Sequence, residues 1–260
     1  MLLAIDVGNT NIVLGLFEGG TPRGVWRLRT EREATADDLL LKLSGLMRLA
    51  GLDVGCVTQA VVACVVPPLR GTVHQLCGRL GVEKPLFIDA ATAAMPIIYD
   101  NPAEIGADRL VNAVAAWERW HRALLVVDFG TATTLDYVTA EGAYAGGIIA
   151  PGVMSAAEAL FQKASRLPRA DVFLAAPAKV IGADTASCLN SGLVLGFAAL
   201  VDGLVERARA EVGDLFVVAT GGLATVIASE ARSIQAVDEN LTLEGLRIIH
   251  SRAVASGRVF

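Results

Sequence analysis

The stretch LLAIDVGNTN, residues 2–11, is an apolar run that ends in an acid, Asp6, followed by a turn of Gly8, Asn9 and Thr10. A hairpin needs a Gly or an Asn in its turn, but it does not need a carboxylate at the end of the strand. Two interpretations are open from this stretch alone. It is a surface hairpin with a solvated Asp6, or it is a backbone loop that binds a phosphate, with Asp6 directed at a metal or the leaving group.

The same design occurs a second time, in LLVVDFGTATT at residues 124–134. The separation along the chain between Asp6 and its counterpart Asp128 is close to half of the 260 residues. Each copy runs into another strand-like segment, IVLGLF at 12–17 and LDYVTA at 135–140. The repeat predicts a duplicated domain in which each half opens with a β-hairpin.

Two such loops facing each other would form a cleft lined by backbone N–H groups and Thr hydroxyls, which bind phosphate oxygens. Carboxylates beside them would hold a hydrated cation that bridges the phosphates. Either loop alone is more often a plain hairpin, but the acid kept in both copies favours the phosphate interpretation. A third signal is LFVVATGGLA, residues 215–224, in which a strand runs into Gly221 and Gly222. It is a tight strand-to-helix turn or a contact to a nucleotide base or ribose.

Composition narrows the class of protein. The chain is 53% hydrophobic and 19% charged, with a net charge of −5, so we expect large cores and no disordered chain. Its basic residues form no runs, which argues against nucleic acid as a partner. The four cysteines form no CxxC pair and the three histidines have no metal-ligand spacing. We therefore expect buried thiols in a reducing compartment, and neither a zinc enzyme nor a Ser-His-Asp hydrolase.

Mean hydropathy is +0.53, which raises the question of a membrane span. The longest uncharged run, residues 185–201, has 17 residues and includes an Asn, two Ser and two Gly. A bilayer span needs about 20 apolar residues, so a buried helix is the better interpretation. Asp6 stands where a signal peptide would still be apolar. We expect a soluble cytoplasmic protein with no membrane partner.

Hydrophobic periodicity and turn residues predict an α/β protein with two domains, at 1–115 and 116–260. The boundary is expected within 100–123, with the chain crossing back near its C-terminus. Strands are predicted at 2–6, 11–17, 24–29, 59–66, 124–128, 134–138 and 144–149, and the run at 215–224 begins with another. Helices are predicted at 37–50, from the Pro67-Pro68 pair to about residue 80, and at 106–121, 153–164, 183–211, 223–230 and 242–256.

The segment NPAEIGADRLVNAVAAW, residues 101–117, carries an acid and a cation at the start of a predicted helix. Asp108 could be only a partner of the helix dipole, and Arg109 only a surface charge. The turn nevertheless lies just before the second loop. A kinase needs a carboxylate near the attacking hydroxyl, and a neighbouring cation suits an anionic substrate. Asp108 is therefore the candidate general base.

Together these stretches resemble the type III pantothenate kinases, a family of the actin, chaperone and sugar-kinase superfamily. The resemblance spans nearly the whole chain in family order. It implies two duplicated actin-like (ribonuclease H-like) domains with a nucleotide cleft between them. The matching stretches are DVGNTN at 6–11, VVPPL at 65–69, IGADRLVNAVAA at 105–116, VVDFGTATTLD at 126–136, GGIIAPG at 146–152, LP at 167–168, IGADTASCLNSG at 181–192, TGGLA at 220–224 and LTLEGLRII at 241–249.

The resemblance implies ATP-dependent phosphorylation of pantothenate to 4'-phosphopantothenate, the first step towards coenzyme A, with Asp108 as the proton acceptor. It implies that Asp6 acts near Mg²⁺, directly or through water, and that Asp128 binds a monovalent cation, K⁺ or NH₄⁺. The ATP contacts it implies are Asp6, Val7, Gly8, Asn9, Thr10, Asn11, Ile12, Val13 and Thr131, with Gly221 and Gly222 as candidate contacts to the base or ribose.

The resemblance also implies a homodimer in which the interface completes the substrate site. The pantothenate contacts it implies are Tyr99, Gly106, Ala107, Asp108, Arg109 and Thr185. From the residues alone, Tyr99 is equally compatible with a structural role, and Thr185 with a place at a helix start. Residues 162–168, QKASRLP, depart from the family pattern at Ser165 and Arg166.

Three rival functions remain open at this point. Another kinase or phosphatase of the superfamily, acting on a sugar or an acyl phosphate, would share both Asp-Gly loops. A non-catalytic regulator could keep the nucleotide cleft, although it should lose Asp108 or one loop. An actin-like structural oligomer would form filaments, and no insertion in the sequence argues for that.

Overall fold

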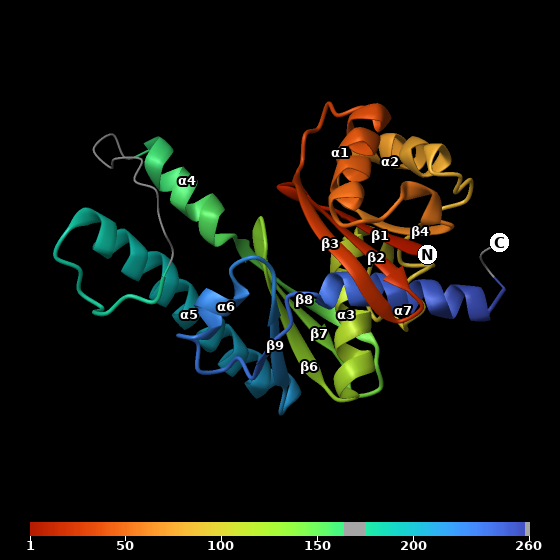
Figure 1. Ribbon diagram of the computed structural model, residues 1–260. Helices are drawn as coiled ribbons and strands as arrows, with labels where there is room; N and C mark the ends of the chain where they lie inside the picture. Colours follow the sequence, from red (N-terminus) through yellow and green to blue (C-terminus); the bar gives the residue numbers. More distant parts are fainter. Residues whose placement is uncertain (164–174, 258–260) are drawn as a thin grey trace. The chain divides into compact units, whose positions relative to one another are not determined.

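The computed structural model describes residues 1–163 and 175–257, which form two compact units (Figure 1). The first unit comprises Met1–Glu118 and Leu241–Phe260, and the second comprises Arg119–Asn240. The LP pair at 167–168 and the departures at Ser165 and Arg166 lie outside the described residues. The predicted domain division at 1–115 and 116–260 stays a prediction; the C-terminal helix packs with the first unit.

The first unit contains a five-stranded mixed sheet in the order β3-β2-β1-β4-β5. The β1–β2 and β2–β3 pairs are antiparallel, whereas β4 is parallel to β1 and β5 is parallel to β4. The predicted hairpin at the first Asp-Gly loop is therefore confirmed. The strands are β1 (Leu2–Val7), β2 (Asn11–Glu18), β3 (Thr21–Arg29), β4 (Gln59–Cys64) and β5 (Leu86–Phe87).

Helices α1 (Ala36–Leu49) and α2 (Pro67–Arg79) pack on one face of this sheet, as Figure 1 shows. Every second side chain of β1 points to that face, because side chains alternate along a strand. These are Leu3, Ile5 and Val7. Thr35 and Asp38 form a capping box that starts α1. The Pro67-Pro68 pair both ends the preceding extended segment and opens α2, where a missing N–H is tolerated.

Helix α7 (Leu241–Ala255) packs on β1, β2 and β4 and beside α3 (Ala107–Trp120). Leu243 contacts the position of Gly15 in β2, and Gly245 lies against the carbonyl of Val111 in α3. The Thr242 hydroxyl donates to Asn112 Oδ1 at 2.7 Å. These contacts explain why the C-terminal helix returns to the first sheet.

The second unit repeats the same plan, with sheet order β10-β9-β6-β7-β8. Two antiparallel pairs are again followed by two parallel ones, so the predicted duplication is confirmed. Helices α4, α5 and α6 pack on the core face of this sheet. The elements are β6 (Leu124–Phe129), β7 (Ala132–Val138), β8 (Tyr144–Pro151), α4 (Val153–Lys163), α5 (Thr185–Val212), β9 (Phe216–Thr220), α6 (Ala224–Ala228) and β10 (Ala236–Val237).

Helix α5 has 28 residues and is long and apolar enough to cross a membrane by length and composition. One of its faces, however, packs into the core of the second unit through Leu193, Val194, Ala198 and Val201. A core helix of a soluble protein passes the same test. The prediction of a buried helix is right for this face.

Candidate active site

The first Asp-Gly loop is a tight turn between β1 and β2. The Gly8 N–H donates to the Asn11 carbonyl at 3.0 Å, which leaves Asn9 and Thr10 at the exposed tip. Asp6, one residue before the end of β1, is half-buried and pairs in register with Val13 and with Ala63 of β4. The predicted ATP contacts Asp6 to Val13 thus lie on one continuous hairpin.

The turn that carries Asp108 lies close to this hairpin. A Cβ at Gly106 would stand 3.7 Å from Val65 Cγ1, and the Val65 N–H donates to the Val7 carbonyl at 3.0 Å. The same Cβ would stand 2.6 Å from Asp108 Oδ1, so glycine lets the carboxylate lie against the backbone. The structure therefore brings the predicted base and the predicted phosphate loop to the same end of β1 and β4.

Asp108 lies in the first turn of α3, and its pKa is raised. Loss of hydration on burial is the largest cause. The Arg109 N–H, which donates to Asp108 Oδ1 at 2.8 Å, and the Arg109 charge act in the opposite direction. A carboxylate with a raised pKa accepts a proton more readily than a solvated one, which suits a general base. Ala107 is buried in the same turn.

The two remaining predicted substrate contacts, Tyr99 and Thr185, belong to other segments of the chain. Tyr99 is 38% exposed in the segment before α3, in the first unit. Thr185 is the first residue of α5, in the second unit, and is exposed. Its neighbour Asp184 caps the helix by accepting from the Ser187 N–H at 2.9 Å. The place of Thr185 at a helix start is therefore seen, and its role towards substrate stays a prediction.

Neighbouring segments also hold the second Asp-Gly loop in place. The Gly130 N–H donates to the Ala132 carbonyl at 3.0 Å, and Ser155 Oγ donates to the Thr131 carbonyl at 2.7 Å. The backbone of Gly152 lies directly against the carbonyls of Gly130 and Thr131. Sequence reasoning missed Ser155 and Gly152 as loop contacts, although Gly152 ends one of the family stretches.

Gly221 brings the end of β9 against the predicted cation ligand. A Cβ there would stand 2.5 Å from Asp128 Oδ1 and 2.7 Å from the Phe129 carbonyl oxygen. Gly221 also has φ +95°, a conformation that favours glycine. The Asp128 carboxylate and the Phe129 carbonyl oxygen thus both lie close to the Gly221 backbone. Such oxygen groups are the ligands that hard cations take, and the role of Asp128 towards a cation stays a prediction.

Within residues 1–163 and 175–257, no group of three His, Cys, Asp or Glu could hold a metal ion by itself. Mg²⁺ in phosphotransferases usually takes one or two carboxylates and completes its shell with substrate phosphates and water. Asp6, a single half-buried carboxylate at the phosphate loop, fits that use.

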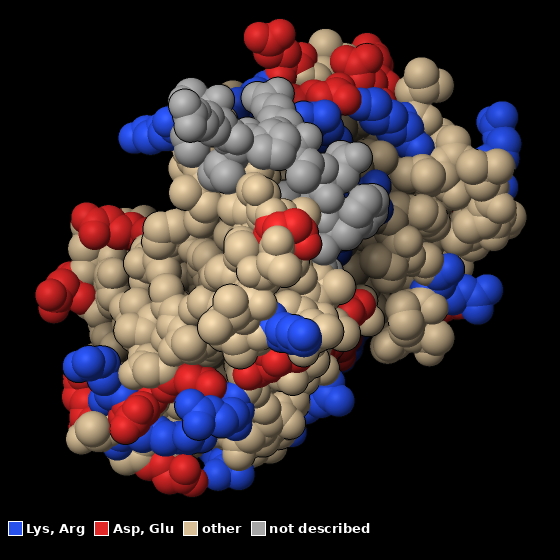
Figure 2. Space-filling view, turned by 90° about the vertical axis from the view of Figure 1, so that its left-hand side faces the viewer, with Lys and Arg blue, Asp and Glu red and all other residues tan. Residues whose placement is uncertain are grey.

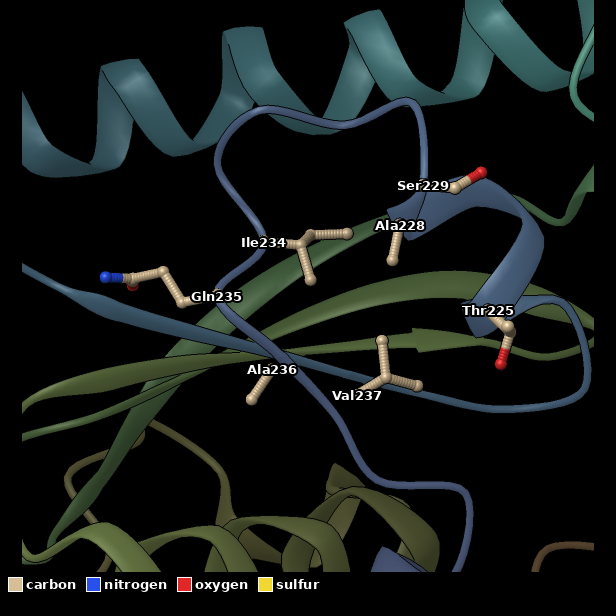
Figure 3. Close-up of a pocket in the computed structure, with 7 residues that line it drawn as sticks. All are labelled: Thr225, Ala228, Ser229, Ile234, Gln235, Ala236 and Val237. Atoms are coloured by element: carbon tan, nitrogen blue, oxygen red, sulfur yellow. The ribbon is translucent and has the colours of Figure 1, made fainter.

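A pocket of about 270 Å³ lies beside α6, which begins shortly after Gly221 and Gly222 (Figure 3). Figure 3 shows Ala228, Ile234 and Val237 directed into it, with Thr225 at one end. The Thr225 hydroxyl donates to Glu239 Oε1 at 2.7 Å. The lining mixes apolar side chains with polar ones, and nothing else in the pocket indicates a ligand. Sequence reasoning gave no signal for this pocket beyond the glycine pair.

The side of the molecule shown in Figure 2 carries a broad uncharged area, with Lys, Arg, Asp and Glu mixed at its margins. No extended basic stripe is visible on the described part of this face. Exposed apolar side chains occur on α4, at Met154 and Leu160, and shortly before α5, at Val180 and Ile181.

Two sheets of one topology, each with an Asp-Gly hairpin loop at the end of its central strand, define an actin-like protein of the sugar-kinase type. Residues 2–207 match the model of the family "Type III pantothenate kinase". The chain belongs to the type III pantothenate kinase family and is a phosphotransferase.

One relative, a type III pantothenate kinase from Desulfatibacillum aliphaticivorans, is 51% identical over 254 residues, covering 97% of this chain and 98% of its own. A structure of a Baf family protein, named as a transcriptional activator, from Campylobacter jejuni has a TM-score of 0.60 at 20% identity, over 97% and 99% of the two chains. The activator of 2-hydroxyisocaproyl-CoA dehydratase from Clostridium difficile, with bound ADPNP, has a TM-score of 0.53 at 11% identity, over 100% and 98%. Both structures support the fold.

Proposed function

We propose that the protein transfers the γ-phosphoryl group of ATP to the primary hydroxyl of pantothenate, and that Asp108 accepts the hydroxyl proton. The observation that carries this proposal is the Asp108 turn, which places a carboxylate of raised pKa at the same strand ends as loop 8–10. The family membership and the relatives' names support pantothenate as the acceptor.

In the proposed reaction the pantothenate oxygen forms a bond to the γ-phosphorus while the bond from that phosphorus to the β,γ-bridging oxygen breaks. ADP leaves, and the hydroxyl proton passes to Asp108 as the new bond forms, because an alcohol is too weak an acid to lose it beforehand. Loop amides bind the phosphates, and Arg109 supplies a positive charge for the anionic substrate. Bound Mg²⁺ at Asp6 and K⁺ or NH₄⁺ at Asp128 would neutralise charge on the phosphates.

We further propose a homodimer, because the family resemblance implies that a second copy completes the pantothenate site. The exposed Met154 and Leu160 on α4, with Val180 and Ile181 before α5, support an interface in this part of the second unit, since exposed apolar surface marks sites of association. Sedimentation of the purified chain at several concentrations measures this directly. We also propose a cytoplasmic location, which the free thiols of Cys56, Cys64, Cys77 and Cys188 support.

The deciding experiment is ADP release with Mg-ATP and potassium, with and without pantothenate. Asp108→Asn should lower kcat by at least about a hundredfold, the low end of general-base effects. Asp214→Asn, an exposed partner of Arg122, is the matched control and should keep full turnover. A folded Asp108→Asn variant with near-normal turnover would remove the base role. ATP binding without any pantothenate-dependent release would favour another acceptor, tested by a sugar screen, or a regulatory protein.

A further inference from the structure

Thr30, the residue after β3, makes two hydrogen bonds to the first Asp-Gly loop. Its hydroxyl donates to the Gly8 carbonyl at 2.6 Å, and its backbone N–H donates to the Thr10 carbonyl at 2.9 Å. Thr30 is half-buried, more than twenty residues along the chain from the loop that it contacts. Nothing in the motif around Asp6 points to it.

The two bonds fix the direction of two peptide groups. In a trans peptide the C=O and the following N–H point to opposite sides. Because the Gly8 and Thr10 carbonyls are directed at Thr30, the N–H groups of Asn9 and Asn11 are directed away from it. The Gly8 N–H is already used within the turn, on the Asn11 carbonyl. Of these two groups, the Asn9 N–H lies at the exposed tip of the turn, and backbone N–H groups in tight turns are the kind that binds an anion.

We propose that Thr30 is a positioning residue for ATP: its hydroxyl holds the Gly8 carbonyl inward so that the loop presents its amides to the phosphates. This inference rests on the proposed function, because it takes the anion to be the phosphate chain of ATP. Thr30 itself does not touch the nucleotide in this proposal. It acts through the orientation of the Gly8–Asn9 peptide.

A purely structural role for Thr30 makes a different prediction. The backbone bond to Thr10 extends the β2–β3 ladder, and any residue except proline could make it. Only a hydroxyl side chain makes the bond to Gly8. Thr30→Val keeps the backbone N–H and the branched shape at Cβ and removes only the hydroxyl, so it separates the two roles.

The test compares the full-length wild type with Thr30→Val, Thr30→Ser and the control Thr21→Val. Thr21 is exposed at the other end of β3, at the hairpin turn after β2. We would measure the Kd for Mg-ADP by calorimetry, KM for ATP and for pantothenate, kcat, and the melting temperature. Thr30→Val should raise the Kd for Mg-ADP and KM for ATP about three- to tenfold, in keeping with the loss of one hydrogen bond. KM for pantothenate should not change, and Thr30→Ser should bind Mg-ADP like the wild type.

Three results would overturn the inference. The first is an unchanged Kd for Mg-ADP in Thr30→Val. The second is weaker Mg-ADP binding in Thr30→Ser as well as in Thr30→Val. An equal rise in KM for pantothenate, together with a lower melting temperature, would also overturn it, because that is the pattern of a structural role. A wild type that binds Mg-ADP but phosphorylates no pantothenate refutes the proposed function alone. A wild type that binds no nucleotide refutes both.

Discussion

Replacing Gly221 by alanine tests the close contact between the end of β9 and the Asp128 carboxylate. With φ at +95°, Gly221 occupies a conformation that costs an L residue about 1–2 kcal/mol. The added Cβ would also meet Asp128 Oδ1 at 2.5 Å and the Phe129 carbonyl oxygen at 2.7 Å. The carboxylate can rotate away, but the carbonyl belongs to β6 and cannot move without disturbing its pairing with β7 and β9.

Conformational strain and the two contacts together should lower the free energy of unfolding by about 2–4 kcal/mol. At about 2–4 °C per kcal/mol for a chain of this size, the melting temperature should fall by about 4–16 °C. Displacement of the carboxylate should also weaken the response of ADP release to potassium. Differential scanning calorimetry and a potassium titration at saturating Mg-ATP measure the two effects.

Gly203→Ala is the matched control, because Gly203 lies within α5 of the same unit and a Cβ there meets nothing within 4 Å. Alanine is the better helix former, so this variant should gain about 0.5–1 kcal/mol. If Gly221→Ala has the melting temperature of the wild type and keeps its potassium response, then Gly221 does not approach Asp128 as described. The cation assignment would then lose its geometric support.

Three further outcomes are expected. Asp128→Ala should flatten the potassium titration of ADP release while the protein stays folded by circular dichroism; an unchanged titration counts against the ion site. Arg32→Gln, which removes a guanidinium 3.4 Å from Asn9 Oδ1 at the loop tip, should raise KM for ATP about two- to fivefold, and less so at high salt because exposed charges are screened; equal effects at both salt concentrations would refute an electrostatic cause. Burial lowers the pKa of His250, so the folded state keeps it neutral while the unfolded chain protonates near pH 6.5. The free energy of unfolding should therefore be highest above about pH 6.5 and decrease as the pH falls below it. Urea titrations at several pH values should show a smaller decrease in His250→Gln.

The duplicated hairpins could be predicted from the sequence because the residues that indicate each of them lie close together in the chain. An apolar run, an acid and a Gly-containing turn lie within ten residues, and the observed strands β1, β2, β6 and β7 fall within two residues of the predicted ends. The edge strands β5 and β10 were missed because each has only two residues and no alternating pattern. Their pairing depends on the neighbouring strand in space rather than on their own sequence.

The candidate site divides in the same way. Asp6, Asp108 and Asp128 can be proposed from the sequence, because carboxylates at strand or helix ends stand out in a motif, and their roles stay predictions. Thr30 could not be found, because its role follows from the antiparallel pairing of β2 and β3, which carries the end of β3 back to the loop. The direction of the Asp108 pKa shift was equally out of reach, since its main cause is burial, which no spacing along the chain reveals.

The duplication also explains how one motif can serve two proposed tasks. Asp6 pairs across the parallel ladder with Ala63, and Asp128 at the equivalent position pairs with Thr220. After Ala63 the chain stays extended, and the Val65 N–H bonds to the Val7 carbonyl. After Thr220 it turns at once through Gly221, whose backbone lies against the Asp128 carboxylate.

What differs between the two loops is therefore the segment that follows the neighbouring parallel strand. In the second unit that segment brings the Gly221 backbone against the acid and against the Phe129 carbonyl oxygen of β6, two oxygen groups of the kind that the proposed monovalent cation would need. In the first unit that segment stays extended and its Val65 side chain lies at the Asp108 turn, with Asp6 as the carboxylate that we propose for Mg²⁺. Two hairpins of the same design thus have different neighbours beside their acids, and we propose this difference as the reason why they would hold different ions.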